Sequence, residues 1–196
     1  MCRVTHPEEH RPHHPDAETL QAGLPEVRRS PSDAGVVDML VLRPAVDVRT
    51  VVDAVTADLE LGFVGDGWLE RGNSRRPDGS ADPDAQVTIM NSRAALLMAG
   101  QRERMALAGD QVYLDLDLSV DNLPAGTVLD FGKAALEVTP PPHTGCSKFK
   151  DRFGIDALRL TADTDGRYLR LRGINARVVR AGTISVGDVA RVTRPA

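Results

Sequence analysis

The chain has 196 residues, a hydrophobic content of 41% and a formal net charge of −4 at pH 7. One domain is the default organisation at this length, and the acidic balance argues against nucleic acid as a partner. No apolar run approaches the roughly 20 residues that cross a bilayer, and the first residues lack the apolar stretch of a secretory signal, so no membrane partner and no export are expected. With only two cysteines, Cys2 and Cys146, the composition favours a reducing, cytoplasmic location.

The charge is unevenly distributed along the chain. Residues 1–145 hold 13 Lys+Arg against 23 Asp+Glu, whereas residues 146–196 hold 11 against 5. A basic C-terminal section suits a small anionic ligand, although a solvated positive face is the simpler interpretation.

Residues 1–35 have the composition of a disordered tail. They contain five of the prolines, four of the five histidines and little apolar periodicity. Such a segment buries too little surface to offset the entropy of ordering it. His6 and His10 have helical spacing that would suit a metal, but the neighbouring prolines break that helix, so disorder is favoured.

The globular pattern begins at residue 36, which makes residues 36–196 the expected domain. Residues 36–42 predict a strand, residues 48–61 fit either a helix or strands, and residues 65–86 predict a long surface loop rich in Gly, Pro and Asp. Asn91 is suited to cap a helix that ends at Gly100. Further strands are expected at 112–118, 127–131, 134–139, 167–172, 175–180 and 189–193. Many short strands with only one or two helices predict a mainly β fold, a small closed or partly closed barrel.

Cys146 is the most informative single residue. Cys2 lies in the presumed tail, so Cys146 is expected to be a free thiol. The run Pro140–Pro142 prevents a helix just before it, which places the thiol on a loop. Three cations follow within six residues, and nearby cations favour the thiolate, which is both a nucleophile and a soft metal ligand.

Several short motifs, taken in order, resemble the MOSC domain, the C-terminal domain of molybdenum cofactor sulfurases that also occurs in small stand-alone proteins. These are Gly65-Asp66, Asp84-Ala-Gln86-Val-Thr88, Asn122-Leu-Pro-Ala-Gly126, Leu136-Glu-Val-Thr139, Cys146-Ser-Lys148 and Gly182-Thr-Ile-Ser-Val-Gly187-Asp188. The resemblance covers residues 36–196 and implies a mostly β barrel with a few short helices. The sequence differs from the family's pattern just before Cys146. His143-Thr-Gly145 stands there, where the family commonly has an arginine shortly before a Pro-Cys pair.

The resemblance implies an interaction with molybdenum cofactor (molybdopterin), or with sulfur destined for it. In relatives that bind the cofactor, the cysteine that matches Cys146 is the molybdenum ligand. Cofactor-bearing relatives reduce N-hydroxylated compounds, and others have been proposed to deliver sulfur to metal centres. The chain has no room for a pyridoxal-phosphate domain, so that cofactor is not expected here, and sulfur or electrons would come from a partner protein.

Other residues are candidates for holding the cofactor. Lys148 and Arg152 could bind phosphate, and Asn122 could serve a pterin edge. Arg170 and Arg172 would alternate on one strand and add positive charge. Each has a simpler alternative: Lys148 and Arg152 as a solvated helix face, and Asn122 as a turn former.

Two other functions use the same cysteine. His143 and Cys146 could form a metal-free nucleophile–base pair, although no third, orienting group is evident from the sequence. Cys146 could instead hold a persulfide in a non-catalytic sulfur carrier. A buried, inert cysteine is the structural alternative, against which the prolines and cations argue.

Overall fold

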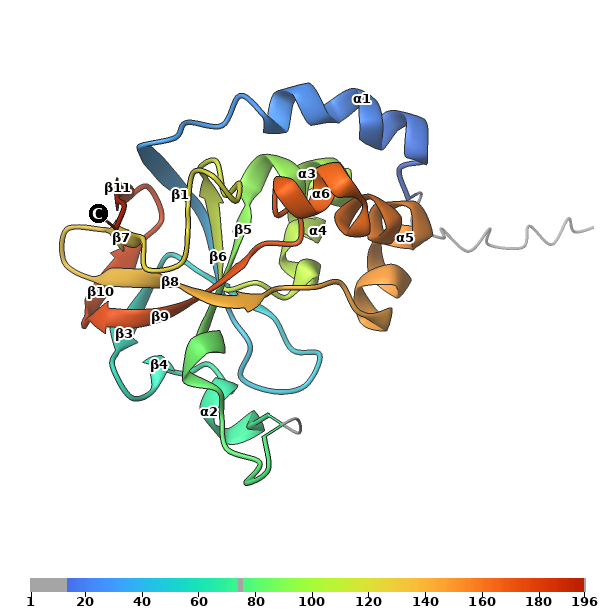
Figure 1. The fold of residues 1–196 in the computed structure, drawn as a ribbon. Coiled ribbons are helices and arrows are strands. Elements are labelled where there is room, and N and C mark those ends of the chain that lie inside the picture. The colour runs from blue at the N-terminus through green and yellow to red at the C-terminus, as the bar shows by residue number, and fades with distance from the viewer. Residues whose placement is uncertain (1–13, 74–75, 196) are drawn as a thin grey trace, which may run out of the picture.

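A closed β-barrel forms the centre of the molecule (Figure 1). The computed structural model describes residues 14–73 and 76–195. Among these residues, seven strands close on themselves because the first strand pairs with the last. In order around the barrel they are β1 (Ala34–Leu42), β11 (Val189–Thr193), β7 (Val128–Asp130), β8 (Ala135–Pro142), β9 (Ile174–Arg180), β5 (Val87–Asn91) and β6 (Val112–Asp115). Closure removes the sheet edges that would otherwise invite pairing with other chains.

Two smaller additions extend the barrel. β2 (Thr50–Val52) pairs antiparallel with the end of β1, and a second sheet contains β10 (Gly182–Ser185), β3 (Ala54–Asp58) and β4 (Gly62–Phe63). Residues 48–61, which were ambiguous in the sequence, therefore contain strands, as their β-branched content favoured. The remaining barrel pairs are antiparallel except β5 and β6, which run parallel.

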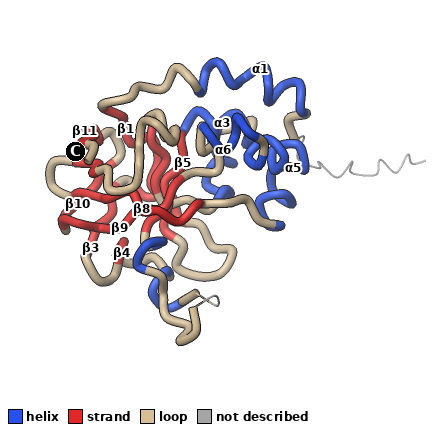
Figure 2. Tube along the Cα trace, in the orientation of Figure 1, coloured by secondary structure: helices blue, strands red, loops and turns tan. Residues whose placement is uncertain are grey.

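The helices gather on one side of the barrel, except α2 (Figure 2). They are α1 (Ala17–Val27), α2 (Trp68–Arg71), α3 (Ser92–Ala99), α4 (Arg102–Met105), α5 (Ser147–Ala162) and α6 (Thr164–Tyr168), with short 3₁₀ turns η1 (Pro83–Ala85) and η2 (Ala106–Ala108). The predicted start of α3 is confirmed, because the Asn91 side chain accepts a hydrogen bond from the Ala94 backbone N–H and Gly100 ends the helix with φ 70°. None of the helices in the described ranges is long and apolar enough to span a bilayer.

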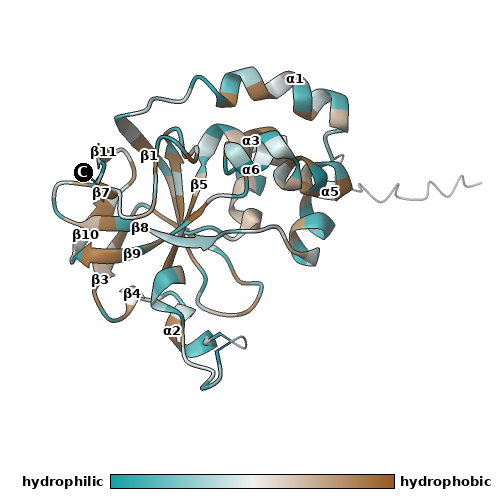
Figure 3. Cartoon of the chain, viewed as in Figure 1, coloured by the Kyte–Doolittle hydropathy of each residue, from teal (hydrophilic) through white to brown (hydrophobic). Residues whose placement is uncertain are grey.

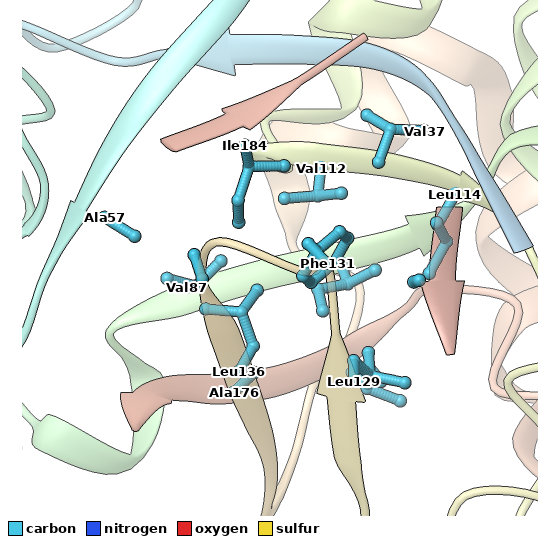
Figure 4. Close-up of a cluster of buried hydrophobic side chains, with 14 of the residues drawn as sticks. Val37, Ala57, Val87, Val112, Leu114, Leu129, Phe131, Leu136, Ala176 and Ile184 are labelled. Atoms are coloured by element: carbon cyan, nitrogen blue, oxygen red, sulfur yellow. The ribbon is translucent and has the colours of Figure 1, made fainter. Parts of the chain in front are cut away.

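β1 serves two hydrophobic cores at once. Val37 and Leu40 belong to the core inside the barrel, whereas Met39 and Val41 belong to a second core beneath the helices. Strict alternation would place residues 37 and 39 on the same face, but the pairing of β1 with β6 shifts register between them. Figure 4 shows side chains from several strands meeting inside the barrel, and Figure 3 shows apolar residues concentrated on those strands.

The expectation of a tail over residues 1–35 is wrong for its described part. α1 begins after Asp16, which accepts a hydrogen bond from the Thr19 backbone N–H, and packs on α3 and α5. Its buried residues Leu20, Leu24 and Val27 have the helical spacing of an amphipathic face, a signal hidden by the proline-rich residues before it. Residues 1–13, with His6, His10 and His13, lie outside the described residues.

Two other expectations need correction. Residues 167–172 do not form a strand: Asp163 caps α6 by accepting from the Gly166 N–H, and Arg170 adopts a left-handed conformation with φ 49°. The long helix α5 was not predicted as an element. Gly154, with φ 89° and ψ 166°, interrupts α5 and divides it into two helical halves.

The buried face of α1 generates a stability prediction. Leu20→Ala should lower the free energy of unfolding by about 3 kcal/mol, because it removes a buried side chain and leaves a cavity. For a chain of this size, that corresponds to a drop in melting temperature of roughly 6–12 °C. Leu96→Ala, on the exposed face of α3, is the matched control and should change the melting temperature little. Equal effects in thermal unfolding would show that α1 does not contribute to the core.

Candidate functional site

The connection from β8 to α5 positions the predicted nucleophile. β8 continues to Pro142, but its pairing with β9 is irregular between Val138 and Pro142. Cys146 is the N-cap residue of α5, with an extended backbone (φ −126°, ψ 177°), and its side chain makes no capping hydrogen bond. The thiol is free and exposed, as the sequence predicted, so it is accessible to a ligand or a reagent.

His143 lies beside a buried carboxylate that sequence reasoning missed. Its Nδ1 is 3.3 Å from Oδ1 of Asp110, and neither atom has another hydrogen-bond partner among the described residues. Nη1 of Arg172 donates to Oδ2 of Asp110 at 2.6 Å, and Nη2 donates to the Ala108 carbonyl. The Arg172 guanidinium also lies over the Phe149 ring, 5.0 Å from its centre. Asp110 thus joins His143 and Arg172, which come from distant parts of the sequence.

The charges of this group fix its protonation. Burial alone would raise the pKa of Asp110, but the charge of Arg172 and the contact with His143 outweigh burial and lower that pKa to about 2. Burial lowers the pKa of His143, and the positive charge of Arg172 lowers it further, while Asp110 opposes the change. Near neutral pH the group therefore contains an ionised Asp110 and a neutral His143, which is the form that accepts a proton.

A second buried ion pair holds the adjoining loops. Both carboxylate oxygens of Asp66 accept from the Arg43 guanidinium at 3.0 Å, and they also accept from the backbone N–H groups of Arg43 and Trp68. Arg43 also donates to the Gly109 carbonyl at 3.1 Å, next to Asp110. Asp66 therefore connects the end of β1 to the start of α2, and its role is to stabilise these loops.

A group of cations surrounds Asp47 on the loop between β1 and β2. We call Asp47, Arg49, Lys148 and Arg152 the Asp47 cluster. Lys148 Nζ is 2.9 Å from both oxygens of Asp47, and Arg152 Nη2 is 2.6 Å from Oδ1. Hydrogen bonding to Lys148 is the main reason that the pKa of Asp47 is lowered. The two predicted phosphate ligands are thus brought together, with a carboxylate between them.

Arg49 of the cluster and Arg71, whose charge interacts with that of Arg49, form no ion pair with an acid in the described part of the chain. Burial is the main cause that lowers the pKa of both arginines, and Arg43 lowers both further, while Asp47 opposes the change at Arg49 and Asp66 opposes it at Arg71. Among the described residues, Nε of Arg49 is buried without a hydrogen-bond partner and the Arg71 side chain forms no hydrogen bond. The cluster therefore carries more positive charge than Asp47 balances, which is the property of an anion-binding site.

The structure separates the other predicted site residues from this group. Asn122 donates to the Ser32 and Asp117 carbonyls and accepts from Arg194, so it stabilises a turn. Arg170 donates to the Leu123 carbonyl at 2.6 Å. Because residues 167–172 are not a strand, Arg170 and Arg172 do not share a strand face: Arg172 is buried against Asp110, and Arg170 lies at a cavity described next.

A cavity of about 590 Å³ opens beside the loop that precedes Cys146. We call it the proline-loop cavity. Its walls are the loop 139–145, residues of the second half of α5, and the connection from Gly166 to Asn175. Of the predicted site residues it is lined by His143, Arg170 and Arg172, whereas Cys146, Lys148, Arg152 and Asn122 lie outside it.

Comparison with known proteins identifies the class of protein to which this fold belongs. The family model described as "MOSC domain" matches residues 68–191. This chain belongs to the MOSC domain family, which is associated with molybdenum cofactor sulfurase-like proteins. No curated protein matches the sequence.

Solved structures share the fold at low sequence identity. The YUAD protein from Bacillus subtilis superposes with a TM-score of 0.59 at 19% identity, covering 81% of this chain and 95% of its own. YiiM from Escherichia coli gives a TM-score of 0.52 at 19% identity, covering 82% and 71%. YiiM from Geobacillus stearothermophilus gives 0.53 at 15%, covering 82% and 75%. At these identities the likeness shows the barrel fold alone.

The neutral state of His143 generates a pH prediction. Its pKa is lower in the folded chain than the ordinary 6.5, so the unfolded chain binds more protons just below that pH. The stability that His143 contributes is therefore complete above pH 6.5 and is lost as the pH falls below it. His143→Gln should flatten the fall in unfolding free energy as the pH is lowered just below 6.5, measured by urea denaturation.

Asp110 accounts for a loss of stability in a separate, lower pH range. Its folded pKa of about 2 lies below the ordinary 3.8, so its contribution is present above pH 3.8 and is lost as the pH falls towards 2. His143→Gln should leave a loss in that lower range. The same slope of unfolding free energy just below pH 6.5 in wild type and in His143→Gln would contradict the assignment to His143.

Proposed function

We propose that this chain engages molybdenum cofactor through Cys146, which supplies a thiolate to the metal. The observation that carries the proposal is the exposed, free thiol at the start of α5, two residues before Lys148 of the under-neutralised Asp47 cluster. The cofactor is a pterin dithiolene with a terminal phosphate, so its host needs one soft ligand and several anion donors. The chain offers both on adjoining segments.

The donor set fits this group. Cys146 would be a single protein ligand, which suits a metal whose other sulfur ligands belong to the cofactor itself. Arg49 and Arg71 would hold the phosphate, because their guanidinium groups form no ion pair with an acid among the described residues. Lys148 and Arg152 would join them if the Asp47 carboxylate moved aside, because that carboxylate now occupies their donors.

The activity that we favour is a small oxidoreductase that reduces N-hydroxylated compounds, or else delivery of sulfur to metal centres. When bound, the cofactor would supply redox chemistry at molybdenum. The chain's own part is to anchor the metal with Cys146, to neutralise the phosphate, and to provide a proton acceptor at His143, held by Asp110. A partner protein would supply the electrons or the sulfur.

A metal-free thiol enzyme is the second candidate, and one observation favours it. The contact between Asp110 and His143 provides the orienting group that the sequence did not reveal. Exposure of Cys146 equally suits a persulfide carrier, in which the outer sulfur must be reached by an acceptor. Metal content and persulfide content separate these candidates from the cofactor-binding function.

Loss of the thiol should abolish metal retention. In protein purified from a host that makes molybdenum cofactor, Cys146→Ser should reduce the molybdenum content, measured by mass spectrometry, to the level of an unrelated protein, because a neutral hydroxyl replaces a soft anion poorly. Ser147→Ala, the next residue, is the matched control and should retain the metal. Equal molybdenum in wild type and Cys146→Ser would remove the ligand role. Absence of metal from both, with persulfide on wild type alone, would favour the carrier.

Removal of the Asp47 charge should strengthen cofactor retention. Asp47→Asn frees Lys148 and Arg152 from their carboxylate, and asparagine tolerates the left-handed backbone at this position (φ 62°). During dialysis at increasing salt, we expect the variant to lose molybdenum several-fold more slowly than wild type, since phosphate contacts are salt-sensitive.

Asp151→Asn provides the control for this experiment. Asp151 lies on α5, near Lys150 and away from the contacts of Asp47. The substitution removes one negative charge from the same region, so the variant should lose molybdenum during dialysis at the same rate as wild type. Faster loss from Asp47→Asn would show that Asp47 helps to hold the cofactor instead of competing with it.

A further inference from the structure

The proline-loop cavity has the dimensions of a small-molecule site. Its volume of about 590 Å³ falls within the range of ligand pockets in proteins. Pro140, Pro141, Pro142 and Ile174 provide an apolar wall. Asn175 on the opposite strand is buried and donates to the Pro141 carbonyl, which fixes this wall against β9.

The charge of the cavity is not balanced. Its walls carry three arginines, Arg167, Arg170 and Arg172, and no aspartate or glutamate. Arg172 is neutralised by the fully buried Asp110. Neither Arg167 nor Arg170 forms an ion pair with any residue in the described part of the chain. Two positive charges therefore face the cavity without a counter-ion from the chain.

Arg170 is held at the cavity with an uncommon backbone conformation and a partly desolvated charge. It has a left-handed backbone with φ 49°, which is uncommon for a long side chain. Burial lowers the pKa of its guanidinium, which shows that the charge is partly removed from water. Within the part of the chain that the structure describes, only its Nη1 is engaged, by the Leu123 carbonyl at 2.6 Å. The remaining donors are available to a ligand.

We propose that the proline-loop cavity binds a small organic anion, whose carboxylate or phosphate contacts Arg167 and Arg170 and whose apolar body lies against the prolines and Ile174. Planar oxyanions match the donor geometry of arginine. The site is separate from the Asp47 cluster, because neither Cys146 nor Lys148 lines the cavity. His143 is shared, since it lines the cavity and contacts Asp110, so a bound anion would lie beside a proton acceptor.

Calorimetric titration of the metal-free full chain with phenyl phosphate tests this proposal, with benzoate as the carboxylate probe and benzyl alcohol as the uncharged probe. At least one of the two anions should bind at least about tenfold more tightly than the alcohol, the difference expected from one charge-assisted contact. Arg167→Gln and Arg170→Gln should each weaken binding of that anion by about tenfold. Arg167→Gln is the safer variant, because this residue is exposed and has no partner to lose.

Arg159→Gln is the matched control. Arg159 lies on the second half of α5, but its side chain is exposed to solvent and pairs with Asp156. Its loss should therefore change the anion affinity less than twofold. Cys146→Ser should also leave the affinity unchanged, which separates this site from the proposed metal ligand. Equal weakening by Arg159→Gln and Arg167→Gln, or equal affinity for the alcohol and both anions, would overturn the proposal.

A second arm distinguishes a free organic anion from the cofactor's own phosphate. If the protein carries molybdenum, the metal-loaded form should bind the anion as tightly as the metal-free form. Loss of binding on loading would overturn the proposal, because the cavity would then belong to the cofactor. Failure to find molybdenum leaves the titration of the metal-free chain as a complete test by itself.

Discussion

Asp110 is ionised in the interior because Arg172 lies against it, and the arrangement of the candidate site depends on that ion pair. A lone buried carboxylate would be strongly destabilising, and removal of one partner from such a pair leaves an uncompensated charge. Arg172 is in turn held by the Ala108 carbonyl and by the face of Phe149 on α5. One ion pair therefore connects the η2 turn, the approach to β9 and the first half of α5.

The same pair determines what His143 can do. Burial and the positive charge of Arg172 keep the imidazole neutral, and the negative charge of Asp110 lies at its Nδ1. The ring is thus placed as a proton acceptor in the wall of the proline-loop cavity. The Asp47 cluster is exposed and contains its own carboxylate, whereas the proline-loop cavity has arginines and no acid in its walls. The two proposed anion sites therefore differ in whether a carboxylate of the chain competes with the ligand.

The sequence was informative where the signals are local. Asn91 and Gly100 mark the ends of α3 through hydrogen bonds and backbone angles within a few residues, and the short β-branched runs mark most barrel strands. It was uninformative where a charge meets its partner across the fold. Asp110 and Arg172 are 62 residues apart, and Asp47 and Lys148 are 101 apart, so no spacing rule connects them. The alternation of residues 167–172 also misled, because a side-chain cap at Asp163 and a left-handed Arg170 favoured a helix and turn there.

The interruption of α5 at Gly154 allows substitutions to alter the two proposed anion sites separately. The half before the interruption carries Lys148 and Arg152, and the half after it contributes Leu158 and Thr161 to the cavity wall. In a continuous helix, each residue inserted into one half would turn the other half by about 100° around the helix axis. The extended backbone at Gly154 breaks that coupling, so that substitutions which re-orient one half need not displace the other. A single segment of chain thereby contributes to both proposed binding surfaces, and each half can be altered by substitution without moving the other.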